Sequence, residues 1–321
     1  MIPVNTPLLD GNELKYLSEC ITTGWISSEG PFIQRFESGM AQSVGRQHAI
    51  AVCNGTAALE LAVAALELGE GDEIIMPTFT IISCAQAAVR RGCKPVLVDC
   101  DPHTWNMDVS QIETRITPRT RAIMVVHIYG LPVDMDPILE LAEKYQLYLI
   151  EDAAEMHGQA YRGKLCGSFG DISAFSFYPS KHITTGEGGM VVTDGDALAD
   201  KTPSLRNLCF QPVKQFVHER LGWNYRMINM QAARGVAQLE RLDAHIACKR
   251  CMGQRWMDPA QQRLVRRWDN AGHFPDLPHF PHHVHVGDEK QVVPGRALSI
   301  LDLIDLVEQK LESRPERSDE D

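Results

Sequence analysis

The sequence has no uninterrupted apolar stretch long enough to cross a membrane. Its first residues, MIPVNTP, have neither a basic flank nor an apolar segment and so do not look like a secretory signal. Apolar residues nevertheless make up 44% of the 321 residues, which is enough for a large core. We therefore expect a soluble, cytoplasmic protein without a membrane partner.

Positive charge is also in short supply. The chain has 31 lysines and arginines against 42 aspartates and glutamates, for a formal net charge of −11. Such a chain repels polyanions, so a nucleic acid polymer is not expected as its main partner. A small anion is still possible because backbone amides and a few cations can hold it.

Paired cysteines are not evident. The nine cysteines are an odd number, scattered mostly through strand-like runs rather than arranged as a framework. We predict that they are reduced, small core residues, as is usual in the cytoplasm.

The chain does have a regular alternation of short β-rich runs with helical segments. Strands are predicted over residues 48–52, 73–76, 95–98, 122–127, 147–151, 172–178 and 189–193. Helices are predicted over residues 12–21, 57–68, 83–91, 137–145 and 231–249, and another around Phe32, Phe36 and Met40. Such alternation predicts an α/β fold with a mainly parallel sheet covered on both faces.

Lys181 follows one of these strands directly. The stretch FSFYPSK ends at Lys181, and a loop rich in threonine and glycine comes next. Ligands of doubly wound sheets collect beyond the carboxyl ends of strands, so this lysine is a candidate for chemistry. A solvated surface lysine would look the same in isolation.

Two other strand ends carry polar residues that suit a phosphorylated ligand. At Asn54, Gly55 and Thr56 a strand passes into a helix, whose free amides and dipole favour an anion, although an ordinary helix cap would look similar. Asp152 ends an apolar strand, and a buried carboxylate needs a cation, either an arginine or a protonated ring.

These features occur in an order that resembles one family. The motifs are NGTAA (54–58), VDCDP (98–102), HIYG (127–130), EDAA (151–154), FSF (175–177), KHITTGEGG (181–189) and GWNYR (222–226). Over residues 1 to about 250 they resemble the sugar-nucleotide aminotransferases, which are fold-type I enzymes dependent on pyridoxal phosphate, and within them the GDP-perosamine synthase branch. The resemblance implies an aspartate aminotransferase-like fold with a seven-stranded sheet flanked by helices.

The resemblance also implies roles for individual residues. Lys181 would bind the cofactor aldehyde covalently and Asp152 would face the ring nitrogen. Asn224 would reach the phosphate in the neighbouring subunit, which implies a homodimer with shared sites. The remaining cofactor contacts would come from Gly55, Thr56, Ala57, Ile81, Glu155 and Ser176, with Glu155 in a place usually held by glutamine and Ile81 in one often held by an aromatic. Substrate contacts are expected from Trp25, Ser27, Ser28, His182 and Arg226.

The implied reaction moves an amino group from glutamate to a nucleotide-linked 4-keto-6-deoxy sugar, for surface polysaccharide or glycan biosynthesis. One alternative is a sugar 3-dehydratase of the same fold, in which a histidine replaces the lysine; His182 is adjacent, but the spacing from Ser176 favours Lys181. Another is an inactive, truncated homologue that binds cofactor or a partner. The sequence leaves open the sugar, the nucleotide and the choice between C3 and C4.

The resemblance fades after about Arg255. We expect a cofactor-binding domain over residues 1–235, a reduced or atypical domain over 236–312 and a disordered tail over 313–321. Cys248 and Cys251, with His279, His282, His283 and His285, suggest a zinc site, but one such cysteine pair is a weak signal and we expect no metal.

Overall fold

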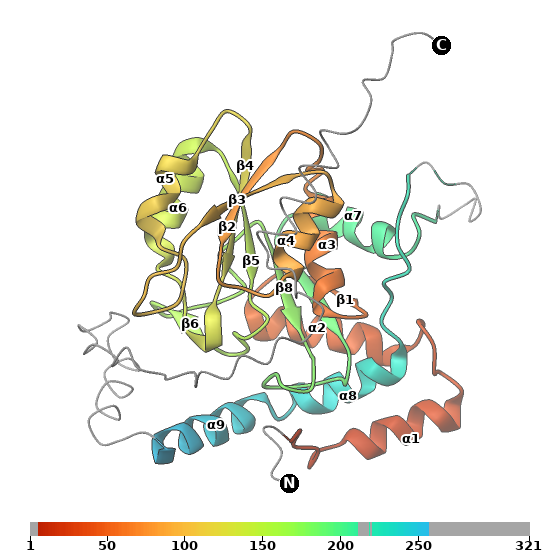
Figure 1. Cartoon of the computed structure of the whole chain (residues 1–321). Coiled ribbons are helices and arrows are strands. Elements are labelled where there is room, and N and C mark those ends of the chain that lie inside the picture. Colours follow the sequence, from red (N-terminus) through yellow and green to blue (C-terminus); the bar gives the residue numbers. More distant parts are fainter. Residues whose placement is uncertain (1–5, 211–217, 219, 257–321) are drawn as a thin grey trace, which may run out of the picture. The chain divides into compact units, whose positions relative to one another are not determined.

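A seven-stranded sheet forms the centre of the computed structural model, which describes residues 6–210, 218 and 220–256 (Figure 1). Its strands lie in the order β1-β9-β8-β5-β4-β2-β3. They are β1 (His48–Val52), β2 (Glu73–Pro77), β3 (Lys94–Val98), β4 (Thr120–Val126), β5 (Tyr148–Asp152), β8 (Ile172–Ser176) and β9 (Gly189–Thr193). Strands β3, β2, β4, β5 and β8 are mutually parallel, whereas β9 runs antiparallel to both of its neighbours. The predicted mainly parallel sheet is confirmed.

Burial explains why these segments form strands. Every residue of the parallel strand β2 is buried, as expected for a parallel sheet covered on both faces, and every residue of the antiparallel strand β9 is buried as well. In the sequence, a short hairpin of β6 (Ala160–Tyr161) and β7 (Lys164–Leu165) connects β5 to β8. Parallel neighbours bring their carboxyl ends to one edge, and that edge holds the ends of β4, β5 and β8.

Helices flank the sheet in two groups (Figure 1). They are α1 (Glu13–Thr23), α2 (Pro31–Val44), α3 (Gly55–Ala65), α4 (Ser83–Arg90), α5 (Ile112–Arg115), α6 (Met135–Tyr145), α7 (Asp196–Arg206), α8 (Asn229–Leu239) and α9 (Leu242–Trp256). Helix α3 is buried on all sides from Ala57 to Ala65, because it packs on β8 and β9 and against α4 and α7. Helix α8 packs against α1 and α2.

The core is aromatic beside the strand that leads to Lys181. Phe36 and Phe177 are fully buried, with ring centroids 4.9 Å apart, and Phe175 is buried next to them in β8. Each such side chain stabilises the fold by about 1.5–3 kcal/mol relative to an exposed one. The strand that ends at Ser176, five residues before Lys181, is therefore anchored in the buried core.

The prediction of one helix over 231–249 is wrong. The structure has α8 and α9, which are separated at Glu240 and Arg241. Glu240 keeps helical angles (φ −57°, ψ −21°) while the Arg241 amide bonds to Gln238 in a tighter turn, so the sequence pattern gives no sign of the break. Helix α7, which contains Pro203, was not predicted.

All nine cysteines lie among the described residues and are free. Cys20, Cys84, Cys93, Cys166 and Cys209 are buried, as predicted, but Cys248 and Cys251 are exposed on α9, so the core assignment is wrong for these two. No described helix is long and apolar enough to span a membrane. Of the expected domain over 236–312, residues 257–312 lie outside the described part, as do the tail and the four histidines of the zinc alternative.

Candidate active site

A cavity of about 740 Å³ opens where β4, β5 and β8 end and α3 begins. This volume is within the usual range for a small-molecule site. Seven of the predicted cofactor residues line it: Gly55, Thr56, Ile81, Asp152, Glu155, Ser176 and Lys181. The fold therefore brings together side chains that are more than a hundred residues apart in the sequence.

The first turn of α3 forms one end of the cavity. Asn54 caps the helix by accepting a hydrogen bond from the Ala57 amide at Oδ1 (2.8 Å), which leaves the amides of Gly55 and Thr56 without intrahelical acceptors. Gly55 lies so close to Ser176 that a Cβ at position 55 would come within 2.9 Å of the Ser176 Cβ. Amides and hydroxyls at a helix start suit a phosphate.

Ala57 itself does not line the cavity, because its amide is taken by Asn54. Ser83, at the start of α4, lines it instead, and its Oγ lies 2.8 Å from the Thr56 Oγ1. No sequence pattern singles out Ser83, since its approach to Thr56 depends on how α3 and α4 pack.

Asp152 lies on the cavity floor at the end of β5 and is 3% exposed. Its Oδ1 accepts a hydrogen bond from the Ala154 amide (3.0 Å), and its Oδ2 accepts one from the Cys84 thiol (3.2 Å). Burial raises the pKa of Asp152, and these two hydrogen bonds counter part of the increase. No arginine, lysine or histidine of the described chain forms an ion pair with it, so a protonated ring nitrogen would supply the missing cation.

Lys181 enters the cavity from the loop after β8 and has an 18% exposed side chain. Its Nζ lies 2.9 Å from the Glu155 Oε1, and the Glu155 Oε2 accepts a hydrogen bond from the Tyr129 amide (2.8 Å). The Lys181 amide donates to the Tyr178 carbonyl (2.9 Å), which fixes the turn. Lys181 and Asp152 thus line the same cavity from neighbouring strand ends.

Pyridoxal phosphate fits these residues. It needs a lysine for its aldehyde, a carboxylate for its ring nitrogen and donors for its phosphate. Lys181, the buried Asp152 and the helix start at Gly55 and Thr56 supply these three groups around one cavity. The buried Asp152 carboxylate, which forms no ion pair with the described residues, is the feature that most requires such a ring.

Aromatic residues that the sequence did not point to form the rim. The ring centroid of Phe79 lies 5.1 Å from that of Trp105 and 6.3 Å from that of Tyr129, and both Phe79 and Tyr129 line the cavity. Ile81 lines it too and is 63% exposed. The HIYG motif that contains Tyr129 was noted in the sequence. That Tyr129 lines the cavity was not predicted.

The predicted substrate residues lie elsewhere. Trp25, Ser27 and Ser28 do not line the cavity, and the buried Asn229 holds their loop through the Trp25 carbonyl (2.8 Å). His182 lines a separate cavity of about 90 Å³. Asn224 and Arg226 also lie outside the large cavity. Asn224 is exposed, and Arg226 hydrogen-bonds to Asn207.

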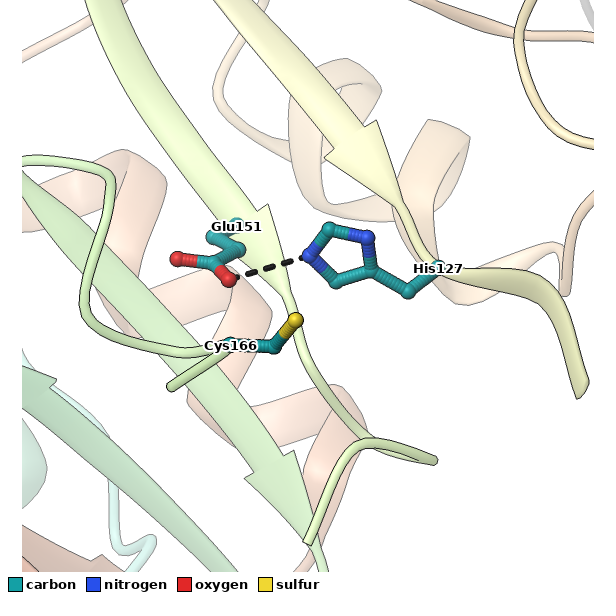
Figure 2. Close-up of side chains that lie close together, drawn as sticks. All are labelled: His127, Glu151 and Cys166. Carbon is teal, nitrogen blue, oxygen red and sulfur yellow. Dashed lines mark hydrogen bonds and ion pairs between the residues drawn. The ribbon is translucent and has the colours of Figure 1, made fainter. Parts of the chain in front are cut away.

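A second carboxylate, Glu151, is buried on the other face of β5 with His127 and Cys166 (Figure 2). The Val133 amide donates to the His127 Nδ1 (3.1 Å), so the His127 Nε2 carries a hydrogen and donates it to the Glu151 Oε1 (3.0 Å). The amides of Gly167 and Phe169 donate to the same carboxylate. Since the protein already uses the ligand atoms of His127 and Glu151, we interpret this group as structural rather than metal-binding.

Comparison with protein families agrees with this reading of the site. The model of the DegT/DnrJ/EryC1/StrS aminotransferase family matches residues 7–263. A second model, Toxin TumE, matches residues 253–314, almost all of which lie outside the described part. The match to the aminotransferase family model thus ends near residue 255, where the resemblance was expected to fade.

Individual relatives agree as well. The chain is 51% identical to GDP-perosamine synthase of Caulobacter vibrioides over 83% of its own length and 71% of the relative's. It is 49% identical to GDP-perosamine synthase of Escherichia coli O157:H7, over 78% and 68%. Among solved structures, 3-amino-5-hydroxybenzoic acid synthase superposes with a TM-score of 0.72 at 39% identity, over 77% of this chain and 65% of the other.

The chain therefore spans about two thirds of the length of that solved structure. The family match covers most of the chain, and the fold, the lysine and the acid at the cavity agree with it. This chain belongs to the DegT/DnrJ/EryC1/StrS aminotransferase family, whose enzymes depend on pyridoxal phosphate.

Proposed function

We propose that this protein transfers the amino group of glutamate to a nucleotide-linked 4-keto-6-deoxy sugar. The observation that carries the proposal is the single cavity lined by Lys181, Asp152 and the helix start at Gly55 and Thr56. The identity to two GDP-perosamine synthases supports a guanosine diphosphate sugar as the first substrate to test. Surface polysaccharide or glycan biosynthesis would use such an amino sugar.

Asp152 and the start of α3 would hold the cofactor. When bound, pyridoxal phosphate supplies a ring that withdraws electrons and an aldehyde whose carbon can bond to the nitrogen of an amine in place of its oxygen. The Asp152 carboxylate would accept a hydrogen bond from the ring N–H, and its negative charge would keep the ring nitrogen protonated. The amides of Gly55 and Thr56 and the Ser176 hydroxyl would bind the phosphate.

Lys181 would move the proton. With cofactor and amino donor bound, the Lys181 Nζ would act as general base and then as general acid: it would remove the proton from Cα of the donor and deliver it to the former aldehyde carbon of the cofactor. Glu155, whose Oε1 lies 2.9 Å from Nζ, would hold the lysine between these steps. The same residues acting in the reverse order aminate the keto sugar.

We further propose a homodimer in the cytoplasm. Asn224 is exposed and does not line the cavity of its own chain, as expected for a residue that completes the site of a partner. Nine free cysteines fit a reducing compartment. Trp25, Ser27, Ser28, His182 and Arg226 stay our candidates for substrate contacts once the sugar is bound.

Incubation of the purified protein with cofactor, glutamate and candidate keto-sugar nucleotides tests the function. We expect an amino sugar and 2-oxoglutarate, and NMR of the product would show whether C3 or C4 carries nitrogen. A deoxygenated sugar without nitrogen would indicate the 3-dehydratase instead. No product from any sugar, despite bound cofactor, would indicate the inactive homologue.

A further inference from the structure

Cys84 is buried directly beneath the cavity, in contact with the acid of the site. It is the second residue of α4 and is 0% exposed. Its Sγ lies 3.2 Å from the Asp152 Oδ2, although the two residues are far apart in the sequence. Helix α4 begins immediately after the cavity-lining residues Thr80 and Ile81, so its first turn delivers the thiol to the floor of the site.

The thiol is the donor in this contact. Burial raises the pKa of Cys84 well above its ordinary value, and the charge of Asp152 raises it further, so the sulfur keeps its hydrogen. A carboxylate only accepts hydrogen bonds, so the hydrogen points to Oδ2. The Thr80 Oγ1 lies 3.4 Å from Sγ and can donate its own hydrogen to the sulfur.

Two donors therefore hold the two oxygens of one carboxylate. The Ala154 amide binds Oδ1 at 3.0 Å and the Cys84 thiol binds Oδ2 at 3.2 Å, which stops rotation of the carboxylate plane. Each oxygen keeps a further lone pair, so the carboxylate can still accept an N–H from a ring above it. Without Cys84, only the bond to Oδ1 would remain to set this plane.

We propose that Cys84 is a positioning residue whose thiol holds the Asp152 carboxylate in the orientation that receives the ring nitrogen of pyridoxal phosphate. The proposal rests on the cofactor role assigned to Asp152. This role differs from a packing role, because the carboxylate is oriented by the hydrogen on sulfur and not by the volume of the side chain. Serine at position 84 should therefore preserve the role of the cysteine, whereas alanine should not.

The test compares Cys84→Ala and Cys84→Ser with Cys93→Ala as a matched control. Cys93 is also buried, but it precedes β3 and does not line the cavity. Dissociation of pyridoxal phosphate is measured by equilibrium dialysis, and protonation of its ring by NMR with ¹⁵N at the ring nitrogen. We expect Cys84→Ala to weaken binding by about tenfold and to lower the protonated fraction, because one hydrogen bond to a charged group is lost. Cys84→Ser and Cys93→Ala should both match the unmodified protein.

Raman spectroscopy of the cofactor-free protein tests the contact by itself. The S–H stretching band that Cys84→Ala removes should lie at the low frequency of a strong donor, and a band at the frequency of a free thiol would overturn the proposal. Unchanged binding and ring protonation in Cys84→Ala would overturn it too, as would a folded Cys84→Ser that fails to restore them. If the unmodified protein does not bind the cofactor through Lys181, the proposed function fails instead, whatever the Raman result.

Discussion

Two neighbouring carboxylates at the end of β5 are both buried, yet they have opposite surroundings. Glu151 faces the closed side of the sheet, where His127 and the amides of Gly167 and Phe169 donate to it (Figure 2). Burial opposes its ionisation, but these donors outweigh burial and lower the pKa of Glu151. Asp152 faces the cavity with two donors, and burial raises its pKa.

The difference distinguishes a structural acid from a functional one. Every oxygen of Glu151 is used inside the protein, so its charge holds the loop after β7 against β4 and β5. Asp152 keeps free accepting capacity and faces open volume, so its charge is available to a ligand. Alternation along a strand puts such different acids side by side, because successive side chains point to opposite faces.

Asp152→Asn should give the largest effect on activity. The amide has the same shape but no charge, so the ring nitrogen would lose the partner that keeps it protonated. We expect the rate of amino transfer to fall by about 10²–10³-fold, as when a preorganised electrostatic contact is removed. Steady-state assays with a keto-sugar nucleotide would measure it, and the thermal midpoint of the cofactor-free protein should not fall. A full rate in this variant would remove the distinction between the two acids.

Glu151→Gln should affect stability rather than chemistry. The substitution leaves an amide group facing buried N–H donors, and each buried donor left unsatisfied costs about 1–3 kcal/mol. Denaturant unfolding of the cofactor-free protein would show the loss. Cofactor affinity of the folded variant should stay within a few-fold of the original. A variant of unchanged stability that no longer binds cofactor would reverse the assignment.

Acid should reduce the stability difference between Glu151→Gln and the unmodified protein. The pKa of Glu151 is lower when folded, so its contribution is complete above the ordinary value of 4.5 and is lost as pH falls through the folded value. Asp152 has the opposite sign: its raised pKa costs stability at neutral pH, and the cost disappears below the ordinary value of 3.8. The free energy of unfolding should be measured from pH 7 down to the lowest pH at which the protein stays folded. Over this range the value for Glu151→Gln should approach that of the unmodified protein. A constant difference would contradict this.

Glu155→Gln should have the smallest effect. Its carboxylate is 35% exposed and pairs with Lys181 near solvent, so we expect a stability change below about 1 kcal/mol. Glutamine can still accept from the Tyr129 amide, so the loop should keep its place. Thermal unfolding would check this, and a loss as large as that of Glu151→Gln would show that exposure does not separate these acids.

Much of this site could be predicted from the sequence, because its residues lie at the ends of strands. Lys181, Ser176, Asp152 and the Gly55 corner each follow or precede a strongly apolar run, and parallel strands bring such ends together. The same logic located the strands themselves within a few residues.

The rest depends on tertiary packing that no local pattern records. Cys84 contacts Asp152 only in the folded chain, where the first turn of α4 meets the end of β5, and a cysteine in a helix by itself predicts only an ordinary core residue. Ala57 was assigned to the phosphate, but the cap at Asn54 takes its amide. The break between α8 and α9 keeps helical angles, so periodicity continues through it.

An absorption spectrum tests directly whether Lys181 and Asp152 hold one pyridoxal phosphate between them. With cofactor added, the protein should show the band of a lysine-linked cofactor, and glutamate should replace that band by one of the aminated form. Lys181→Ala should lack the first band while still binding cofactor. If Lys181→Ala keeps the lysine-linked band, or if glutamate leaves the unmodified spectrum unchanged, the account is contradicted.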